Sequence, residues 1–318
     1  MHTPHLKSEV HRILGDSLLN PSKATQVDIV AHSMGGLVTR AWIAGMAIDK
    51  NNKSVPYNNE VRRLITVATP HYGVSFSAFT TGLFLPCPAT KHARQEQEQR
   101  MQFGSHFLWI LHQKWTNTPF AQERKHALLT IVGTELIDND GIVQVPSATL
   151  SDPDVRARYI HRLHFSISAI SGIVKVDSEH ETFKLVQSFL RAAHPNSPEA
   201  DECNAPACQR DLGNKEPGMV LMRLVDEASH GINLHNRCVV TSMLPNLCLA
   251  EFNVESSIVT IGSLPIDPVN PGKYDITVTV QKNAGFMSPE YGPRTVTGIN
   301  VAPARTTVVG EVILQKSK

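Results

Sequence analysis

The chain has 318 residues, of which 41% are hydrophobic and 19% are charged, and its formal net charge is +1. These values are typical of a globular protein that is long enough for a sizeable core and for two domains. A net charge near zero argues against a polyanionic partner, so we expect no binding to nucleic acid. No apolar run reaches the ~18 residues that a membrane-spanning helix needs.

The N-terminal residues are neither basic nor apolar, so no secretory signal is visible and the sequence indicates no cellular compartment. Residues 1–26 predict one amphipathic helix and then a turn at Asn20-Pro21-Ser22. The apolar positions of this helix are Leu6, Val10, Ile13, Leu14, Leu18 and Leu19.

Residues 31–36, AHSMGG, are the most informative stretch of the chain. They follow an apolar run at Val27–Val30, and they precede a helix-periodic run that predicts a helix over Leu37–Ile48. A strand, a tight turn of small residues and a helix together form the setting of a nucleophile elbow. Ser33 is therefore the candidate nucleophile of a hydrolytic site.

The types of residue around Ser33 agree with the demands of such a turn. The serine has to adopt a strained backbone conformation, and its neighbours two positions away, Ala31 and Gly35, have to be small. The start of the following helix also directs backbone N–H groups at the place where an oxyanion would form. We expect the backbone N–H of Met34 to be one oxyanion donor.

A candidate acid follows the next strands. The segment Val61–Ala68 predicts a strand, and the uncharged run Leu128–Gly133 predicts a central parallel strand. Asp140 comes shortly after this second run, where an acid that orients a histidine must lie, and Asp138 is the fallback. An ordinary Asp-Gly turn is the structural alternative.

The candidate base is harder to identify, because the chain has 15 histidines. We favour His164, which follows Asp140 by 24 residues, near the end of a strand predicted over Arg158–Phe165. The alternative base is His180, which precedes the last predicted helix of this region, Phe183–Ala193. His180 could instead begin that helix, next to a capping box. His32, His71 and His106 are expected to line the pocket.

Four segments, in the same order along the chain, resemble α/β-hydrolase lipases and esterases. They are residues 27–40, residues 64–73, which end in TPHYG, residues 100–108, and residues 139–143. The resemblance implies an α/β fold with a mostly parallel sheet, and a lipase- or esterase-like enzyme that cleaves carboxylic esters. It implies a Ser-His-Asp triad of Ser33, His164 (alternatively His180) and Asp140, an acyl-enzyme, and an ester or lipid substrate.

The same resemblance raises two further expectations. In such lipases a lid lies where residues 74–111 lie here, so this segment is expected to contact a lipid interface or to form a second packed layer. The fold normally has several strands before its nucleophile, and residues 1–26 leave no room for them. The sequence thus predicts an N-terminally truncated hydrolase domain. The alternative function is an impaired hydrolase fold that acts as a binding or interaction protein.

The domain organisation follows from a change in composition. Residues 1–193 are expected to form the hydrolase domain, residues 194–217 a linker rich in Pro and polar residues, and residues 218–318 an all-β sandwich. The segment Pro271–Ile276 weakly resembles Ig-like or carboxypeptidase-regulatory-like modules. The strands are expected at 219–225, 237–243, 247–254, 258–261, 274–280, 294–301 and 306–314.

The five cysteines show no spacing typical of a metal site, and no cofactor is implied. In an exported protein, Cys203 with Cys208 and Cys238 with Cys248 could form disulfides, which would leave Cys87 free.

Overall fold

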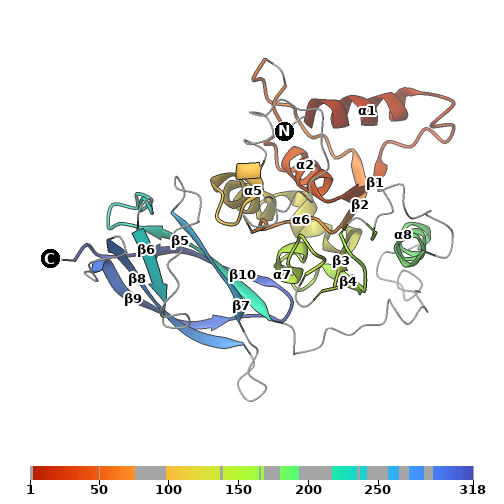
Figure 1. Ribbon diagram of the computed structural model, residues 1–318. Coiled ribbons are helices and arrows are strands. Elements are labelled where there is room, and N and C mark those ends of the chain that lie inside the picture. Colours follow the sequence, from red (N-terminus) through yellow and green to blue (C-terminus); the bar gives the residue numbers. More distant parts are fainter. Residues whose placement is uncertain are drawn as a thin grey trace. The chain divides into compact units, whose positions relative to one another are not determined.

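The structure is a computed structural model, and its fold is shown in Figure 1. It describes residues 3–49, 51–75, 98–136, 139–164, 166–167, 180–192, 217–234, 237–241, 257–264, 272–282 and 289–317. The chain divides into two compact units, Met1–His71 with Ile110–Asp211 and Tyr72–Trp109 with Leu212–Lys318. The domain boundaries expected from the sequence stay predictions, because most of the expected linker lies outside the described residues.

The first unit contains a parallel sheet of four strands in the order β1-β2-β3-β4. The predicted α/β fold class is therefore confirmed. Because all four strands run in the same direction, their carboxyl ends meet at one edge of the sheet, where α/β proteins place their sites. The strands are β1 (Val27–His32), β2 (Val61–Val67), β3 (Leu128–Gly133) and β4 (Arg156–Ile160).

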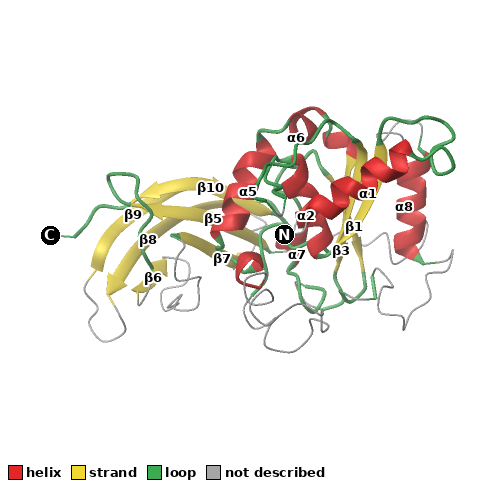
Figure 2. Cartoon of the chain, turned by 90° about the horizontal axis from the view of Figure 1, so that it is seen from above, coloured by secondary structure: helices red, strands yellow, loops and turns green. Residues whose placement is uncertain are grey.

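Helices lie along both faces of this sheet. Leu64 of β2 joins a cluster with Trp42 and Trp115, whereas the next residue, Ile65, joins a cluster with Leu185 and Phe189. Alternate side chains of a strand point to opposite faces, so α2 and α5 cover one face and α8 covers the other, as Figure 2 shows for α2 and α8. The helices are α1 (Thr3–Gly15), α2 (Met34–Ile43), α5 (His106–Thr116), α6 (Pro119–Glu123), η1 (Lys125–Ala127), α7 (Val145–Ala148) and α8 (Glu181–Arg191).

A buried arginine holds the far end of α8. Arg63 of β2 donates hydrogen bonds to the backbone oxygens of Phe189 and Ala192, each at 2.7 Å. These bonds satisfy carbonyl groups that a helix C-terminus otherwise leaves without partners. The last helix is therefore fixed to the central sheet at its C-terminal end.

Two of the predicted elements end five residues earlier than expected. The helix after Ser33 stops at Ile43 instead of Ile48, because the chain turns at Gly45, whose φ is +67°. The strand predicted over Arg158–Phe165 is also wrong at its end, since β4 stops at Ile160. Beyond it the backbone N–H of His164 bonds to the carbonyl oxygen of Asp140, at 2.8 Å, instead of continuing a strand ladder.

The second unit carries two three-stranded sheets, in the orders β10-β5-β7 and β6-β8-β9. Among the described strands of this unit, all pairs are antiparallel except β10 with β5, and side chains of both sheets share one hydrophobic cluster. The expected β-sandwich domain, and its likeness to Ig-like or carboxypeptidase-regulatory-like modules, stay predictions. The strands are β5 (Gly218–Val225), β6 (Arg237–Thr241), β7 (Ile258–Leu264), β8 (Lys273–Lys282), β9 (Pro289–Asn300) and β10 (Thr306–Ile313).

Several expectations fall on residues that the structure does not describe. These are residues 76–97 of the expected lid, the fallback acid Asp138, the strand expected at 247–254, and Cys87, Cys203, Cys208 and Cys248. Cys238 lies in β6. None of the described helices has both the length and the apolar character needed to cross a membrane.

Candidate active site

Ser33 lies in the turn between β1 and α2, in a conformation that few non-glycine residues adopt. Its φ is 53° and its ψ is −126°. A positive φ at a residue with a Cβ stores strain, and such strain is concentrated at functional sites. The backbone N–H of Ser33 is bonded to the carbonyl oxygen of Val67 at 2.8 Å, which fixes the turn to the neighbouring strand.

The steric demand of this turn is greatest at Gly36. A Cβ placed on Gly35 would lie 3.7 Å from Cβ of Ala31, which is an ordinary contact. A Cβ on Gly36, in contrast, would overlap with the buried side chain of Thr69. The second glycine of the motif is therefore required by the loop after β2, which the local pattern alone does not reveal.

Three of the predicted site residues lie in one hydrogen-bonded row. Nε2 of His164 lies 2.9 Å from Oγ of Ser33, and Nδ1 of His164 lies 2.8 Å from Oδ2 of Asp140. The side chains of His164 and Asp140 are 2% and 1% exposed, so water does not compete for their hydrogen bond. Ser33, Asp140 and His164 come from the turns after β1, β3 and β4 respectively, at the carboxyl edge of the sheet.

The carboxylate of Asp140 has a partner at each oxygen. Oδ1 accepts the backbone N–H groups of Ile142 and Val143, at 3.0 and 2.7 Å, which leaves Oδ2 for His164. An ionised carboxylate only accepts, so Nδ1 of His164 carries the proton. The lone pair of Nε2 then faces the hydroxyl of Ser33 and can accept its proton.

Gly133, at the end of β3, makes room for this acid, and sequence reasoning did not identify it. A Cβ there would lie 2.6 Å from Cβ of Asp140 and 2.6 Å from the carbonyl oxygen of Arg162. Both distances are shorter than real contacts allow. The absence of a side chain at this position therefore lets the turns that carry the acid and the histidine approach each other.

His32, the last residue of β1, contacts His164. Its Nε2 lies 2.9 Å from the carbonyl oxygen of His164, and the two rings have centroids 4.9 Å apart. Burial, followed by the neighbouring His164, lowers the pKa of His32 to about 4. The ring is therefore neutral near pH 7, and it donates Nε2–H to the backbone of His164.

The other predicted histidines lie elsewhere. His71 is buried, with Nδ1 3.0 Å from Arg40 and Nε2 3.2 Å from Thr66. It lies between Arg40 of α2 and Thr66 of β2, and no described hydrogen bond joins it to Ser33. His106 is the exposed first residue of α5.

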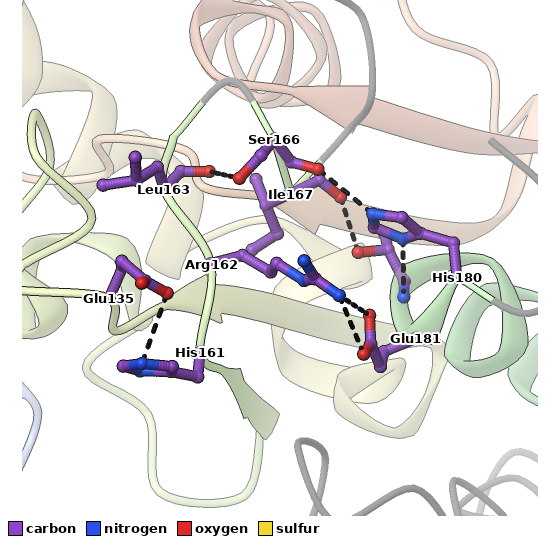
Figure 3. Close-up of polar contacts among 9 residues, drawn as sticks. Glu135, His161, Arg162, Leu163, Ser166, Ile167, His180 and Glu181 are labelled. Carbon is purple, nitrogen blue, oxygen red and sulfur yellow. Dashed lines mark hydrogen bonds and ion pairs between the residues drawn. The ribbon is translucent and has the colours of Figure 1, made fainter. Parts of the chain in front are cut away.

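His180, the alternative base, lies at the N-terminus of α8. Its Nδ1 accepts the backbone N–H of Thr182 at 3.3 Å, and its Nε2 lies 3.1 Å from the carbonyl oxygen of Ser166. Figure 3 shows the ring of His180 directed at Ser166. Both of its ring nitrogens thus have partners other than Ser33 and Asp140.

Met34 is the first residue of α2, directly after Ser33. The first N–H groups of a helix have no acceptor within it, and the positive end of the helix dipole lies there. The backbone N–H of Met34 thus occupies the position in which a nucleophile elbow holds an oxyanion donor. No group of His, Cys, Asp or Glu among the described residues could hold a metal ion.

The buried histidines of this unit predict an acid-sensitive fold. Burial and then the charge of Arg40 lower the pKa of His71 well below 6.5 and that of His112 to about 4. The unfolded chain binds protons at these rings near pH 6.5, whereas the folded chain does not. The stabilisation is therefore present above pH 6.5 and is lost as the pH falls, by about 2 kcal/mol at pH 5 for His112. Urea unfolding should give a smaller free energy of unfolding at pH 5 than at pH 7, and equal values would contradict this account.

Comparisons with known proteins found one matching family and several similar folds. Residues 2–103 match the family model described as "Putative serine esterase (DUF676)". A search of the curated proteins found no match. Phospholipase PlaB from Legionella pneumophila is similar over 99% of this chain and 82% of that chain, with 13% identity and a TM-score of 0.63. The same phospholipase in complex with thio-NAD gives 14% identity and a TM-score of 0.64, with the same coverage.

The likeness to PlaB concerns the fold, because 13–14% identity is too low to carry more. The family match is carried by the sequence of residues 2–103, which include β1, Ser33 and α2. These residues therefore have the sequence pattern of a serine esterase family, and the chain combines an α/β-hydrolase fold with two further, mostly antiparallel sheets.

Proposed function

We propose that this chain is a serine hydrolase that cleaves carboxylic esters through an acyl-enzyme. The observation that carries the proposal is the unbroken row from Oγ of Ser33 through the ring of His164 to Oδ2 of Asp140, with distances of 2.9 and 2.8 Å. Nucleophile, base and orienting acid within hydrogen-bond reach are the arrangement that nucleophilic catalysis requires.

In the first half of the reaction, Oγ of Ser33 attacks the ester carbonyl and its proton passes to Nε2 of His164. The imidazolium that forms is stabilised by the carboxylate of Asp140 across the 2.8 Å bond. His164 then gives the proton to the oxygen of the leaving alcohol as the C–O bond breaks, which leaves the acyl group on Ser33. In the second half, water attacks this acyl group by the same route and releases the acid.

The negative charge on the carbonyl oxygen needs hydrogen-bond donors in the transition state. The backbone N–H of Met34, at the start of α2, is the donor that we propose. Donors of this kind contribute ~3 kcal/mol each, on the order of 10²–10³ in rate.

The surroundings of Asp140, the proposed acid of the triad, suit an ester with an apolar acyl group. Leu136 and Leu163 are 51% and 45% exposed, and both lie against Gly141, next to Asp140. We propose that these two side chains contact the apolar acyl group of the substrate. The match to a phospholipase fold and to a serine esterase family supports a lipid ester as the substrate class. Contact of residues 74–111 with a lipid interface stays a prediction.

The test is hydrolysis of p-nitrophenyl esters of increasing acyl length by the full chain. We expect turnover of the esters and, where deacylation is slow, a burst of p-nitrophenol equal to the enzyme concentration. Binding of the esters without any release of p-nitrophenol would contradict the proposal. That result would favour the alternative of an impaired hydrolase fold that acts as a binding protein.

A further inference from the structure

The short segment that carries His164 is fastened to the beginning of α8. Nε2 of His180 donates to the carbonyl oxygen of Ser166 at 3.1 Å, and Oγ1 of Thr182 donates to the carbonyl oxygen of Ile167 at 2.5 Å. Figure 3 shows both contacts, which reach the segment just after His164. These two residues, together with Glu181 between them, which contacts Arg162, form what we name the α8 anchor.

The third member of the α8 anchor holds the segment on the other side of His164. Both carboxylate oxygens of Glu181 lie 3.0 Å from Nη2 of Arg162. The glutamate is 13% exposed and the arginine 40%, so solvent screens this pair only in part. The α8 anchor therefore fastens residues on both sides of the histidine.

The ring of His180 does two things at once. Its Nδ1 accepts the backbone N–H of Thr182, which caps the helix, and this leaves the proton on Nε2 for the carbonyl oxygen of Ser166. The residue is 7% exposed, so water cannot readily replace the ring at either partner. Without the ring, a helix N–H and a loop carbonyl would both lose their partner.

The opposite side of the segment is fixed by the site itself. The backbone N–H of His164 bonds to the carbonyl oxygen of Asp140, and the carbonyl oxygen of His164 accepts from His32. His164 is thus held between the Asp140 turn with His32 and the α8 anchor. Because Arg63 of β2 also bonds to the C-terminal end of α8, this helix is fixed to the sheet and can support the segment.

We propose that His180 is a positioning residue for His164, which keeps the imidazole within reach of both Ser33 and Asp140. This inference rests on the proposed function and assigns to His180 a role other than that of the base. A displacement of about 1 Å at a catalytic group can lower the rate by ~10²-fold. Loss of the anchor should therefore reduce kcat much more than it changes KM.

The experiment compares His180→Ala with His180→Gln. The amide nitrogen of glutamine can reach the position of Nε2, so this side chain keeps a donor for the carbonyl oxygen of Ser166. We expect His180→Ala to lower kcat ~10- to 100-fold with KM changed less than about threefold. His180→Gln should restore kcat to within about threefold of the original chain, because the amide N–H replaces the contact that holds the segment after His164. Arg191→Ala, at the exposed other end of α8, is the matched control and should leave kcat unchanged.

A second readout does not depend on turnover. The proton on Nδ1 of His164, bonded to the buried carboxylate of Asp140, should give a far-downfield proton NMR signal. We expect this signal to move or broaden in His180→Ala and to persist in His180→Gln and Arg191→Ala. Melting temperatures of all variants show whether the α8 region remains folded.

Two results would overturn the inference. If His180→Ala keeps both kcat and the downfield signal, the α8 anchor does not position His164. If His180→Gln loses all activity while it keeps the fold and the signal, His180 acts chemically. If the unaltered chain cleaves no ester, the proposed function fails, and the NMR comparison alone still supports or overturns the role of His180.

Discussion

Ser33→Ala should abolish ester hydrolysis, with a fall in kcat on the order of 10⁴–10⁶. The substitution removes Oγ of Ser33, which is the proposed nucleophile. Nε2 of His164, which lies 2.9 Å from this oxygen, then has no proton to accept. The fold should persist, because alanine keeps the Cβ and the hydrogen bond of Ser33 to Val67 comes from the backbone. The measurement is kcat/KM for a p-nitrophenyl ester, together with the melting temperature.

Ser22→Ala is the matched control for this substitution. Ser22 lies on the exposed turn before β1, where its Oγ contacts Asn20 at 3.4 Å. This control should keep full activity. A Ser33→Ala protein that retains more than about one per cent of the rate would show that another group is the nucleophile, since loss of a true nucleophile costs far more.

Asp140→Asn should lower kcat by ~10⁴ while the fold is kept. The oxygen of the amide can still accept from Ile142 and Val143, which turns its NH₂ group toward Nδ1 of His164. Nδ1 must then accept, so the proton moves to Nε2 and faces Ser33. In this tautomer the ring cannot take the proton of the serine hydroxyl.

The control is Asp154→Asn, which alters an aspartate that is 70% exposed and paired with Lys125. It should leave the rate unchanged. If Asp140→Asn were as active as this control, Asp140 would not orient the base, and the undescribed Asp138 would become the acid to examine.

The parts of the site that follow from local sequence were predictable. The small residues around Ser33 and the uncharged run of β3 are signals carried by a few neighbouring residues. The turn at Ser33 and β3 form where they were expected, although α2 ends at Ile43 and not at Ile48. The sequence offered His164 and His180 as the base and favoured His164 for its position after Asp140. In the structure His164 lies beside Ser33. The roles of these residues in catalysis remain proposals until they are tested.

The parts that escaped prediction depend on contacts between distant segments. Gly133 has to lack a side chain because Asp140 and Arg162 approach it, and Gly36 because Thr69 does. No local pattern carries such information. The end of β4 was misjudged for the same reason, since the backbone after Ile160 is drawn to the turn of Asp140.

The strands of the second unit illustrate a further limit. Alternating apolar residues predicted the positions of β5 to β10, but alternation does not specify which strands pair. The parallel pairing of β10 with β5 joins residues 306–313 to residues 218–225, so the segment that ends this region lies beside the one that begins it. Such a long-range pairing is fixed by the shared hydrophobic cluster and not by any single strand.

The most direct test of the central claim is to locate the residue that a fluorophosphonate probe modifies. Such probes react with a serine only when a neighbouring base activates it, as His164 is placed to do for Ser33. We predict one adduct per chain, mapped by mass spectrometry to the peptide that contains Ser33, and no adduct in His164→Ala. A stoichiometric adduct on any other residue, or an unmodified Ser33 in the folded chain, would contradict the account.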